Sequence, residues 1–414
     1  MPISTALWKA AMVFSGAYPE APRWAMIRKG SGSMGLLIHW KEGGCFGNFI
    51  GSSQIRQTRK RPMAKKKTLR YAFIGAGGIA GAHMRYLKDM EDVEMVAMAD
   101  ISKPGMEAKA QQFGIDGIYT DYHKMLAEVK PDAVSVCTPN GAHAEASIAA
   151  STAGAHVLVE KPMAMNATEA KKMISVATKK RRKLVIGFQY RYDPKTTFIK
   201  EAVDSGRMGK VVYARIQALR RRGIPNWGVF GRKDLQGGGP LIDIGVHALE
   251  MTHFAMGSPK PVAASGSTFT YLGDRKSNVA SQWPNWDHKN YTVEDLAIGQ
   301  IRFDNGAILA IEASFAAHIE KDVWNFTVMG EKAGANWDPP ALYSDDGGYM
   351  MNSQPNWLPS GPAADIFAAK MRNFVEHCLY DKPTLAPAEH GLMVQKMLDG
   401  IYASAAKGAE VKIR

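Results

Sequence analysis

The chain has 414 residues, of which 46% are hydrophobic and 22% are charged. This composition is typical of a folded globular protein, and the length suits two domains that each bury a core. No run of about 18 apolar residues occurs, so we expect no membrane span and no membrane partner. The three cysteines are far apart and odd in number, which argues against a disulfide framework or zinc site and favours a reducing, cytoplasmic setting.

The net charge of +13 is concentrated at the N-terminus. Residues 1–67 hold 12 of the 52 Lys and Arg but only 2 of the 39 Asp and Glu, so the rest of the chain carries only +3. Because that body is nearly neutral, we do not expect a nucleic-acid partner. Residues 1–67 show no helical or strand period. We interpret them as a basic, disordered extension or as the result of a start assigned upstream of Met63.

The first predicted element is an apolar strand from Leu69, followed by a glycine turn and a helix with an apolar face. The turn, residues 75–80, reads G-x-G-x-x-A. The first glycine permits the tight turn, the second lets the backbone approach a pyrophosphate, and the helix N-terminus attracts phosphates. The pattern predicts a dinucleotide site that includes Gly75, Gly77, Gly78 and Ile79.

A second strand ends in Asp100, 25 residues beyond Gly75. A carboxylate at this position can bond the ribose hydroxyls of NAD and would repel the 2′-phosphate of NADP. Ser102 and Lys103 keep NADP possible. The alternative interpretation is a βαβ unit that binds no nucleotide.

Two further strands end in polar residues. One runs into Thr138, Pro139 and Asn140, with His143 in the next helix, and another runs into the stretch Glu160-Lys161-Pro162. Consecutive parallel strands send their carboxyl ends to one edge, where ligands bind. We therefore expect a doubly wound parallel sheet over residues 68–188, with these residues beside the cofactor.

Residues 189–414 are predicted to form a second α/β domain with an open, largely antiparallel sheet. Strand-like runs follow one another, and the turn at residues 304–306 (Asp-Asn-Gly) is a strong hairpin signal. Residues 331–361 are predicted to be a surface loop. Two helices near 362–380 and 388–406 end the chain and are able to pack back on the first domain.

Within this second domain, a glycine run leads into a helix that carries Asp243 and His247. The two residues are four apart, so an α-helix would place them on one face. A carboxylate one turn from an imidazole can orient it and raise its basicity. The alternative is an exposed pair without consequence, because such pairs are common on helix surfaces.

Together these motifs resemble the glucose–fructose oxidoreductase/inositol dehydrogenase (Gfo/Idh/MocA) family. The matching stretches are FIGAGGIAGAHM, TPNGAHAEA, VLVEKPMA, GFQYRYDP and GGGPLIDIGVHALE. The resemblance implies an NAD(P)-dependent oxidoreductase that acts on a secondary carbinol of a sugar, glycoside or cyclitol. It also implies a homodimer or homotetramer formed through the C-terminal sheet.

The resemblance assigns roles to particular positions. Lys161 corresponds to the active-site lysine, Asp243 and His247 correspond to the acid and the histidine of the second motif, and the positions that usually touch cofactor are Thr138, Asn140, His143 and Glu160. We expect His247, oriented by Asp243, to take the proton of the carbinol hydroxyl. We expect Lys161 to donate to the same oxygen.

The substrate is less defined. Gln189 and Arg191 lie in a stretch that borders the substrate in the family, and Trp227, like Trp283 and Trp286, could stack on a sugar ring or pack against the protein. Three alternatives remain: a glycosidase that uses NAD only transiently, a reductase of imines, biliverdin or diols, and a nucleotide-responsive regulator without turnover. No metal site is predicted.

Overall fold

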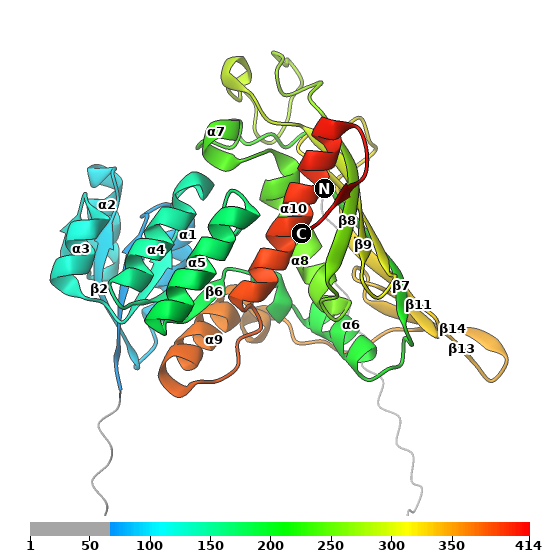
Figure 1. The fold of residues 1–414 in the computed structure, drawn as a ribbon, viewed down its shortest axis with the longest axis horizontal. Coiled ribbons are helices and arrows are strands. Elements are labelled where there is room, and N and C mark those ends of the chain that lie inside the picture. Colours follow the sequence, from blue (N-terminus) through cyan, green and yellow to red (C-terminus); the bar gives the residue numbers. More distant parts are fainter. Residues whose placement is uncertain (1–66) are drawn as a thin grey trace, which may run out of the picture. The chain divides into compact units, whose positions relative to one another are not determined.

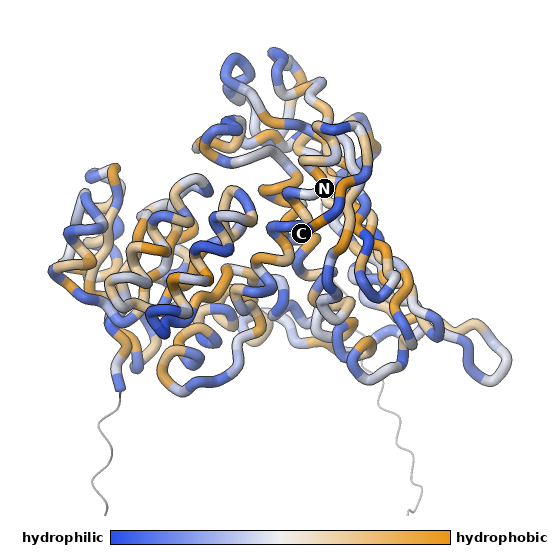
Figure 2. The backbone as a smooth tube through the Cα atoms, viewed as in Figure 1, coloured by the Kyte–Doolittle hydropathy of each residue, from blue (hydrophilic) through white to orange (hydrophobic). Residues whose placement is uncertain are grey.

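The structure is a computed structural model that describes residues 67–414. The interpretation of residues 1–67 as a basic extension therefore lies almost entirely outside the described residues. Within the described part, hydrophobic residues gather along the strands and hydrophilic residues along the connecting loops (Figure 2).

The first sheet has six parallel strands in the order β3-β2-β1-β4-β5-β6. It belongs to the part of the chain coloured blue to green in Figure 1. Its strands are β1 Leu69–Ile74, β2 Val93–Ala99, β3 Gly117–Tyr119, β4 Ala133–Val136, β5 His156–Val159 and β6 Leu184–Ile186. Its helices are α1 Gly78–Leu87, α2 Lys103–Phe113, α3 Tyr122–Val129, α4 His143–Thr152 and α5 Ala167–Lys180. Strand β4 is buried along its whole length, as expected for a parallel sheet covered on both faces. The strand order reverses between β1 and β4, which is where such sheets bind ligands.

The second sheet has nine strands in the order β14-β13-β12-β11-β7-β10-β9-β8-β15. They are β7 Val211–Leu219, β8 Pro261–Phe269, β9 Leu296–Phe303, β10 Ile308–Ser314, β11 Val323–Gly330, β12 Ala333–Asn336, β13 Ala341–Asp346, β14 Tyr349–Ser353 and β15 Val411–Lys412. Only the β7–β10 pair is parallel, so the predicted, largely antiparallel sheet is confirmed. The expected surface loop at 331–361 was wrong, because three short strands with tight turns extend the sheet there.

Helices α6 Pro194–Asp204, α7 Lys233–Gln236 and α8 Val246–Ala255 accompany the second sheet, with α8 packed against β7 and β11. The last two helices connect the halves of the described chain. Helix α9 (Ile366–Tyr380) packs on α1, where the rings of Tyr86 and Phe367 stack at 6.4 Å. Helix α10 (Ala388–Lys407) packs on both α5 and β8. The chain thus returns to the first sheet after completing the second.

No helix within residues 67–414 is long and apolar enough to cross a membrane. In the same range, no group of three His, Cys, Asp or Glu side chains is arranged to hold a metal ion.

Candidate active site

The glycine turn after β1 has the geometry of a phosphate-binding turn. Gly75 has φ +92°, and a Cβ there would lie 2.6 Å from the backbone of Cys137, so only glycine fits. At Gly77 and Gly78 an added Cβ would meet nothing within 4 Å, so this backbone faces open space. Helix α1 begins at Gly78 without a side-chain cap. Its first N–H groups are therefore suited to bind the phosphates of a dinucleotide.

Asp100 lies directly beside this turn. One carboxylate oxygen accepts a hydrogen bond from the Ala76 N–H at 2.6 Å, and the other accepts from the Ser102 N–H at 2.7 Å. The carboxylate at the end of β2 is thereby held at the rim of the glycine turn, next to the place where a dinucleotide would bring its ribose.

The residues after β4 are joined to the Lys161 loop by His143. Its ring nitrogens lie 2.9 Å from the carbonyl oxygen of Thr138 and 2.7 Å from that of Pro162. Burial lowers the pKa of His143, although the bonds to the two carbonyl oxygens oppose this shift. The buried Oγ1 of Thr138 has no hydrogen-bond partner, as expected for a group that meets a ligand. Asn140 donates to the Gln236 carbonyl at 3.0 Å.

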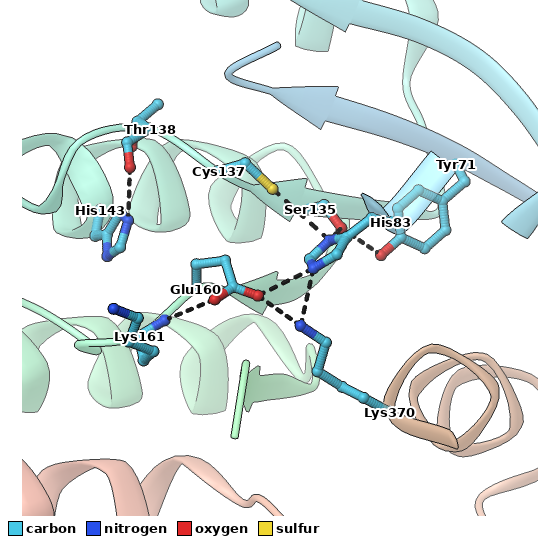
Figure 3. A network of polar contacts seen from close by, with 9 residues as sticks. All are labelled: Tyr71, His83, Ser135, Cys137, Thr138, His143, Glu160, Lys161 and Lys370. Carbon is cyan, nitrogen blue, oxygen red and sulfur yellow. Dashed lines mark hydrogen bonds and ion pairs between the residues drawn. The ribbon is translucent and has the colours of Figure 1, made fainter. Parts of the chain in front are cut away.

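Glu160 does not face the cofactor edge, where we expected it. The side chain is 5% exposed, its Oε1 accepts from Lys370 Nζ at 2.6 Å, and it lies 3.0 Å from His83 Nε2 (Figure 3). Burial alone would raise the pKa of the Glu160 carboxyl, but the Lys370 ammonium and the bond to His83 outweigh it and hold that pKa well below its usual value. The expected cofactor contact of this carboxylate is therefore corrected: the structure buries it in an ionic cluster.

The Lys161 side chain extends from the end of β5 to Asp243 of the second domain. Its Nζ donates to Oδ1 of Asp243 at 2.9 Å and to the Asp243 backbone carbonyl at 2.8 Å. Both side chains are 16% exposed. The pair is thus sheltered from water, where such a bond is stronger than at the surface, yet an edge of it remains accessible.

The turn that carries Asp243 is π-helical rather than α-helical, over Leu241–Gly245. This wider turn changes the expected pairing: the Asp243 carboxylate binds Lys161, and Nδ1 of His247 is buried without a hydrogen-bond partner. The prediction that Asp243 orients His247 is therefore corrected. The His247 ring instead meets the edge of the Tyr190 ring at 5.4 Å. Burial, followed by the nearby Lys161 charge, lowers the pKa of His247 well below its usual value.

A cavity of about 330 Å³ opens beside this group, at the lower end of the range for small-molecule sites. Its walls are formed by Tyr190, Arg220, Pro225, Trp227, Phe230, Asp243, Ile244, His247 and Trp324. Trp227 stands at the rim, 49% exposed, with its ring perpendicular to that of Trp283 at 4.7 Å. A larger, more open hollow of 680 Å³ along β8–β10 shares no residue with this cavity.

The predicted substrate residues have different surroundings. Trp227 lines the cavity, whereas Arg191 is fully buried and its Nε donates to Oε2 of Glu250 at 2.7 Å. Gln189 is also buried, and neither residue lines the cavity. A short 3₁₀ turn at residues 189–192 presents Tyr190 to the cavity in their place. We correct the expectation for Gln189 and Arg191 accordingly.

Sequence reasoning had not selected Tyr190, Arg220, Phe230 or Trp324 as site residues. The sequence contained a partial indication of the site, because the stretch RRRGIPNW begins at Arg220 and ends at Trp227. Trp324, on β11, comes from a strand far along the chain. Trp286 is a packing residue, 8% exposed, whose Nε1 donates to the Gly273 carbonyl at 2.7 Å.

Residues 69–188 match the oxidoreductase family with an NAD-binding Rossmann fold, and residues 200–413 match the C-terminal alpha/beta domain of the same family. The chain belongs to the Gfo/Idh/MocA oxidoreductase family. It is 37% identical over 347 residues to the D-glucoside 3-dehydrogenase of Escherichia coli K12, covering 83% of this chain and 97% of that protein.

Two further members of the family are less similar to this chain. The myo-inositol 2-dehydrogenase of Thermotoga maritima is 30% identical over 247 residues, covering 59% of this chain and 68% of that protein. The solved structure of levoglucosan dehydrogenase in complex with NADH has the same fold, with a TM-score of 0.74 at 22% identity over 84% of this chain and all of that one. The predicted family, fold class, oxidoreductase class and nicotinamide cofactor are confirmed.

Proposed function

We propose that this oxidoreductase uses NAD to oxidise a secondary ring hydroxyl of a glycoside or a related sugar. The observation that carries the proposal is that Asp243 and His247 line one aromatic-walled cavity while Lys161 binds the Asp243 carboxylate at 2.9 Å. The glucoside 3-dehydrogenase, 37% identical along nearly its whole length, supports the choice of substrate class.

In this proposal His247 is the general base. Its lowered pKa keeps the imidazole neutral near pH 7, so the ring can accept the proton of a carbinol hydroxyl within the cavity. Lys161 donates a hydrogen bond to the same oxygen and stabilises the negative charge that develops there. Asp243 holds the Lys161 ammonium in place through its 2.9 Å bond.

The residues proposed to hold the dinucleotide are the glycine turn (Gly75, Gly77, Gly78 and Ile79), Asp100 and Thr138. The open backbone at Gly77 and the unpartnered Thr138 hydroxyl both fit such a ligand. The nicotinamide, when bound, accepts or returns the hydride. The Asp100 carboxylate favours NAD over NADP, because it would repel a 2′-phosphate.

The cavity walls suit a sugar ring. The faces of Trp227 and Trp324 offer apolar surface to the C–H side of a pyranose, and the Arg220 guanidinium offers donors to its hydroxyl oxygens. Burial lowers the pKa of Arg220, although nearby carboxylates oppose the effect. Because a guanidinium is charged in proteins, Arg220 can donate hydrogen bonds to ring hydroxyls.

We also propose a cytoplasmic homo-oligomer assembled through the second sheet. This sheet exposes Ile298, Met329 and Tyr343, each more than 40% accessible, and apolar side chains exposed together favour contact with another copy. The two cysteines of the described range, Cys137 and Cys378, are free thiols, consistent with a reducing compartment. Met329→Asp should lower the mass measured by light scattering, and an unchanged mass would contradict this interface.

The test of the activity is the absorbance of NADH formed from NAD, or of NADPH formed from NADP, by the full chain with a panel of glycosides, free sugars and inositols. NADH formed with glycosides, and abolished in Lys161→Met, is the expected result. Sugar released without net NADH would identify the internal-redox glycosidase instead. Tight NAD binding with neither product would identify a regulator.

A further inference from the structure

Two adjacent residues at the end of β5 have opposite surroundings. Lys161 extends to Asp243 beside the cavity, whereas Glu160 is turned into the interior, where Lys370 of α9 binds it. Lys370 follows Glu160 by 210 residues and is only 1% exposed. A lysine and a glutamate are almost never buried this completely unless they are paired.

The polar groups around this pair form a connected network. His83 Nε2 lies 2.9 Å from Lys370 Nζ, and His83 Nδ1 lies 2.9 Å from the Ser135 hydroxyl, which in turn bonds Tyr71 at 2.8 Å (Figure 3). Burial, with the nearby Lys370 charge, lowers the pKa of His83 to about 4, so the imidazole is neutral at pH 7. The cluster therefore holds one anion and one cation.

We propose that Lys370 is a positioning residue for Lys161, acting through Glu160. The second Glu160 oxygen accepts from the backbone N–H of Lys161 at 3.3 Å, so the carboxylate that Lys370 holds also restrains the chain that carries Lys161. Because Glu160 forms an ion pair with Lys370, it does not compete for the Lys161 ammonium, which pairs with Asp243. The inference rests on the proposed catalytic role of Lys161.

The same pair sets part of the field at His247. Besides burial, the charges that shift the pKa of this imidazole are those of Lys161 and Glu160 from the end of β5, Lys370 from α9 and Arg220 from the end of β7. Asp243 from the π turn and Tyr190 from the turn before α6 line the cavity beside it. Glu160 raises the pKa of His247 and Lys370 lowers it. Neutralising one member of the pair should therefore shift that pKa opposite to neutralising the other.

The experiment compares Lys370→Met, Glu160→Gln and the double variant. We expect Lys370→Met to lower kcat by at least about tenfold when kcat is expressed per mole of protein that binds NADH. In this variant Glu160 has lost its partner and competes with Asp243 for the Lys161 ammonium. The acid limb of the kcat/KM profile should move to higher pH in Lys370→Met and to lower pH in Glu160→Gln. The double variant, which carries neither charge, should return the limb close to its original position and recover most of the activity.

Arg372→Met is the matched control. Arg372 also lies on α9 and binds Asp92 of the first domain at 3.0 Å, but it does not touch Glu160. Its removal should lower the thermal unfolding temperature without changing kcat or the pH profile. If all variants share one pH profile and differ only in unfolding temperature, the cluster is merely structural and the proposal is overturned. Should Lys370→Met not fold, Glu160→Gln and the double variant still decide the sign of the shift.

A second measurement separates this inference from the proposed function. Crystal structures of the three variants show, without any substrate, whether Lys161 still binds Asp243. If Lys370→Met does not crystallise, the double variant is compared with Glu160→Gln. If this bond is broken in Lys370→Met but present in the double variant, the positioning role is supported even when no sugar is oxidised. If Lys161 binds Asp243 in every variant, the positioning role is overturned even when the dehydrogenase activity is established.

Discussion

The glycine turn that receives the cofactor and the cavity proposed to receive the substrate are built differently. The turn uses consecutive residues, 75–80, and presents mainly backbone, with open space at Gly77 and Gly78. The cavity gathers side chains from the 3₁₀ turn at residues 189–192, the segment after β7, the π turn and β11. A backbone site depends on the local conformation of a few residues, whereas a side-chain site depends on the packing of distant ones. Changes at the two should therefore separate cofactor binding from turnover.

The largest effect is expected in the cavity. His247→Ala should lower kcat about 1000-fold, because the general base is removed, while NADH affinity measured by fluorescence stays within about twofold. Lys161→Met should act in the same direction. Turnover that survives in His247→Ala would remove this residue from the mechanism and weaken the division between the two sites.

The next effect concerns the turn. Gly77→Ala should leave the unfolding temperature almost unchanged, since the new Cβ meets no protein atom, but it should lower NAD affinity about tenfold by obstructing the pyrophosphate. Gly75→Ala is the comparison, because its Cβ would collide with the Cys137 backbone and its φ is +92°. That variant should lose stability as well. Equal NAD affinity in Gly77→Ala and the parent would place the cofactor elsewhere.

A smaller effect is expected at the cavity rim. Trp227→Ala should raise KM for the sugar about tenfold with kcat changed less than about threefold, because the deleted indole contacts the ring and not the reacting atoms. Trp357→Ala is the control: this tryptophan is 73% exposed and does not line the cavity. A fall in kcat with constant KM would assign Trp227 to the chemistry instead.

The smallest effect is on the free energy of unfolding and involves buried histidines in both domains. Burial is the main cause that lowers the pKa of His83, His156 and His390 to about 4 and that of His253 to about 3. As pH falls below 6.5, the unfolded chain takes up protons that the folded chain refuses, so the free energy of unfolding should decrease between pH 6.5 and about 4.

Denaturant titrations across that range measure this slope. His156→Gln should flatten it by about one proton, or roughly 1.4 kcal/mol per pH unit. A free energy of unfolding that is constant between pH 6.5 and 4.5 would contradict the buried neutral state of these histidines.

Much of this protein follows from local pattern. The glycine turn, the parallel strands before Asp100 and Lys161, and the Asp-Asn-Gly hairpin at residues 304–306 were all predicted, because φ preferences and hydrophobic period act over a few residues. Residues 331–361 were predicted wrongly because their strands are short and rich in turn formers, and they form by pairing in succession onto β11.

Side-chain direction and charge pairing were decided by the tertiary structure. Adjacency in sequence suggested that Glu160 and Lys161 serve one site, yet Lys370 draws the first into the interior and Asp243 holds the second at the cavity. The π turn likewise pairs Asp243 with Lys161 rather than with His247. The physical reason is that a buried charge takes whichever opposite charge the packing brings within bonding distance. That partner can lie 210 residues away, as Lys370 does, where no local pattern reveals it.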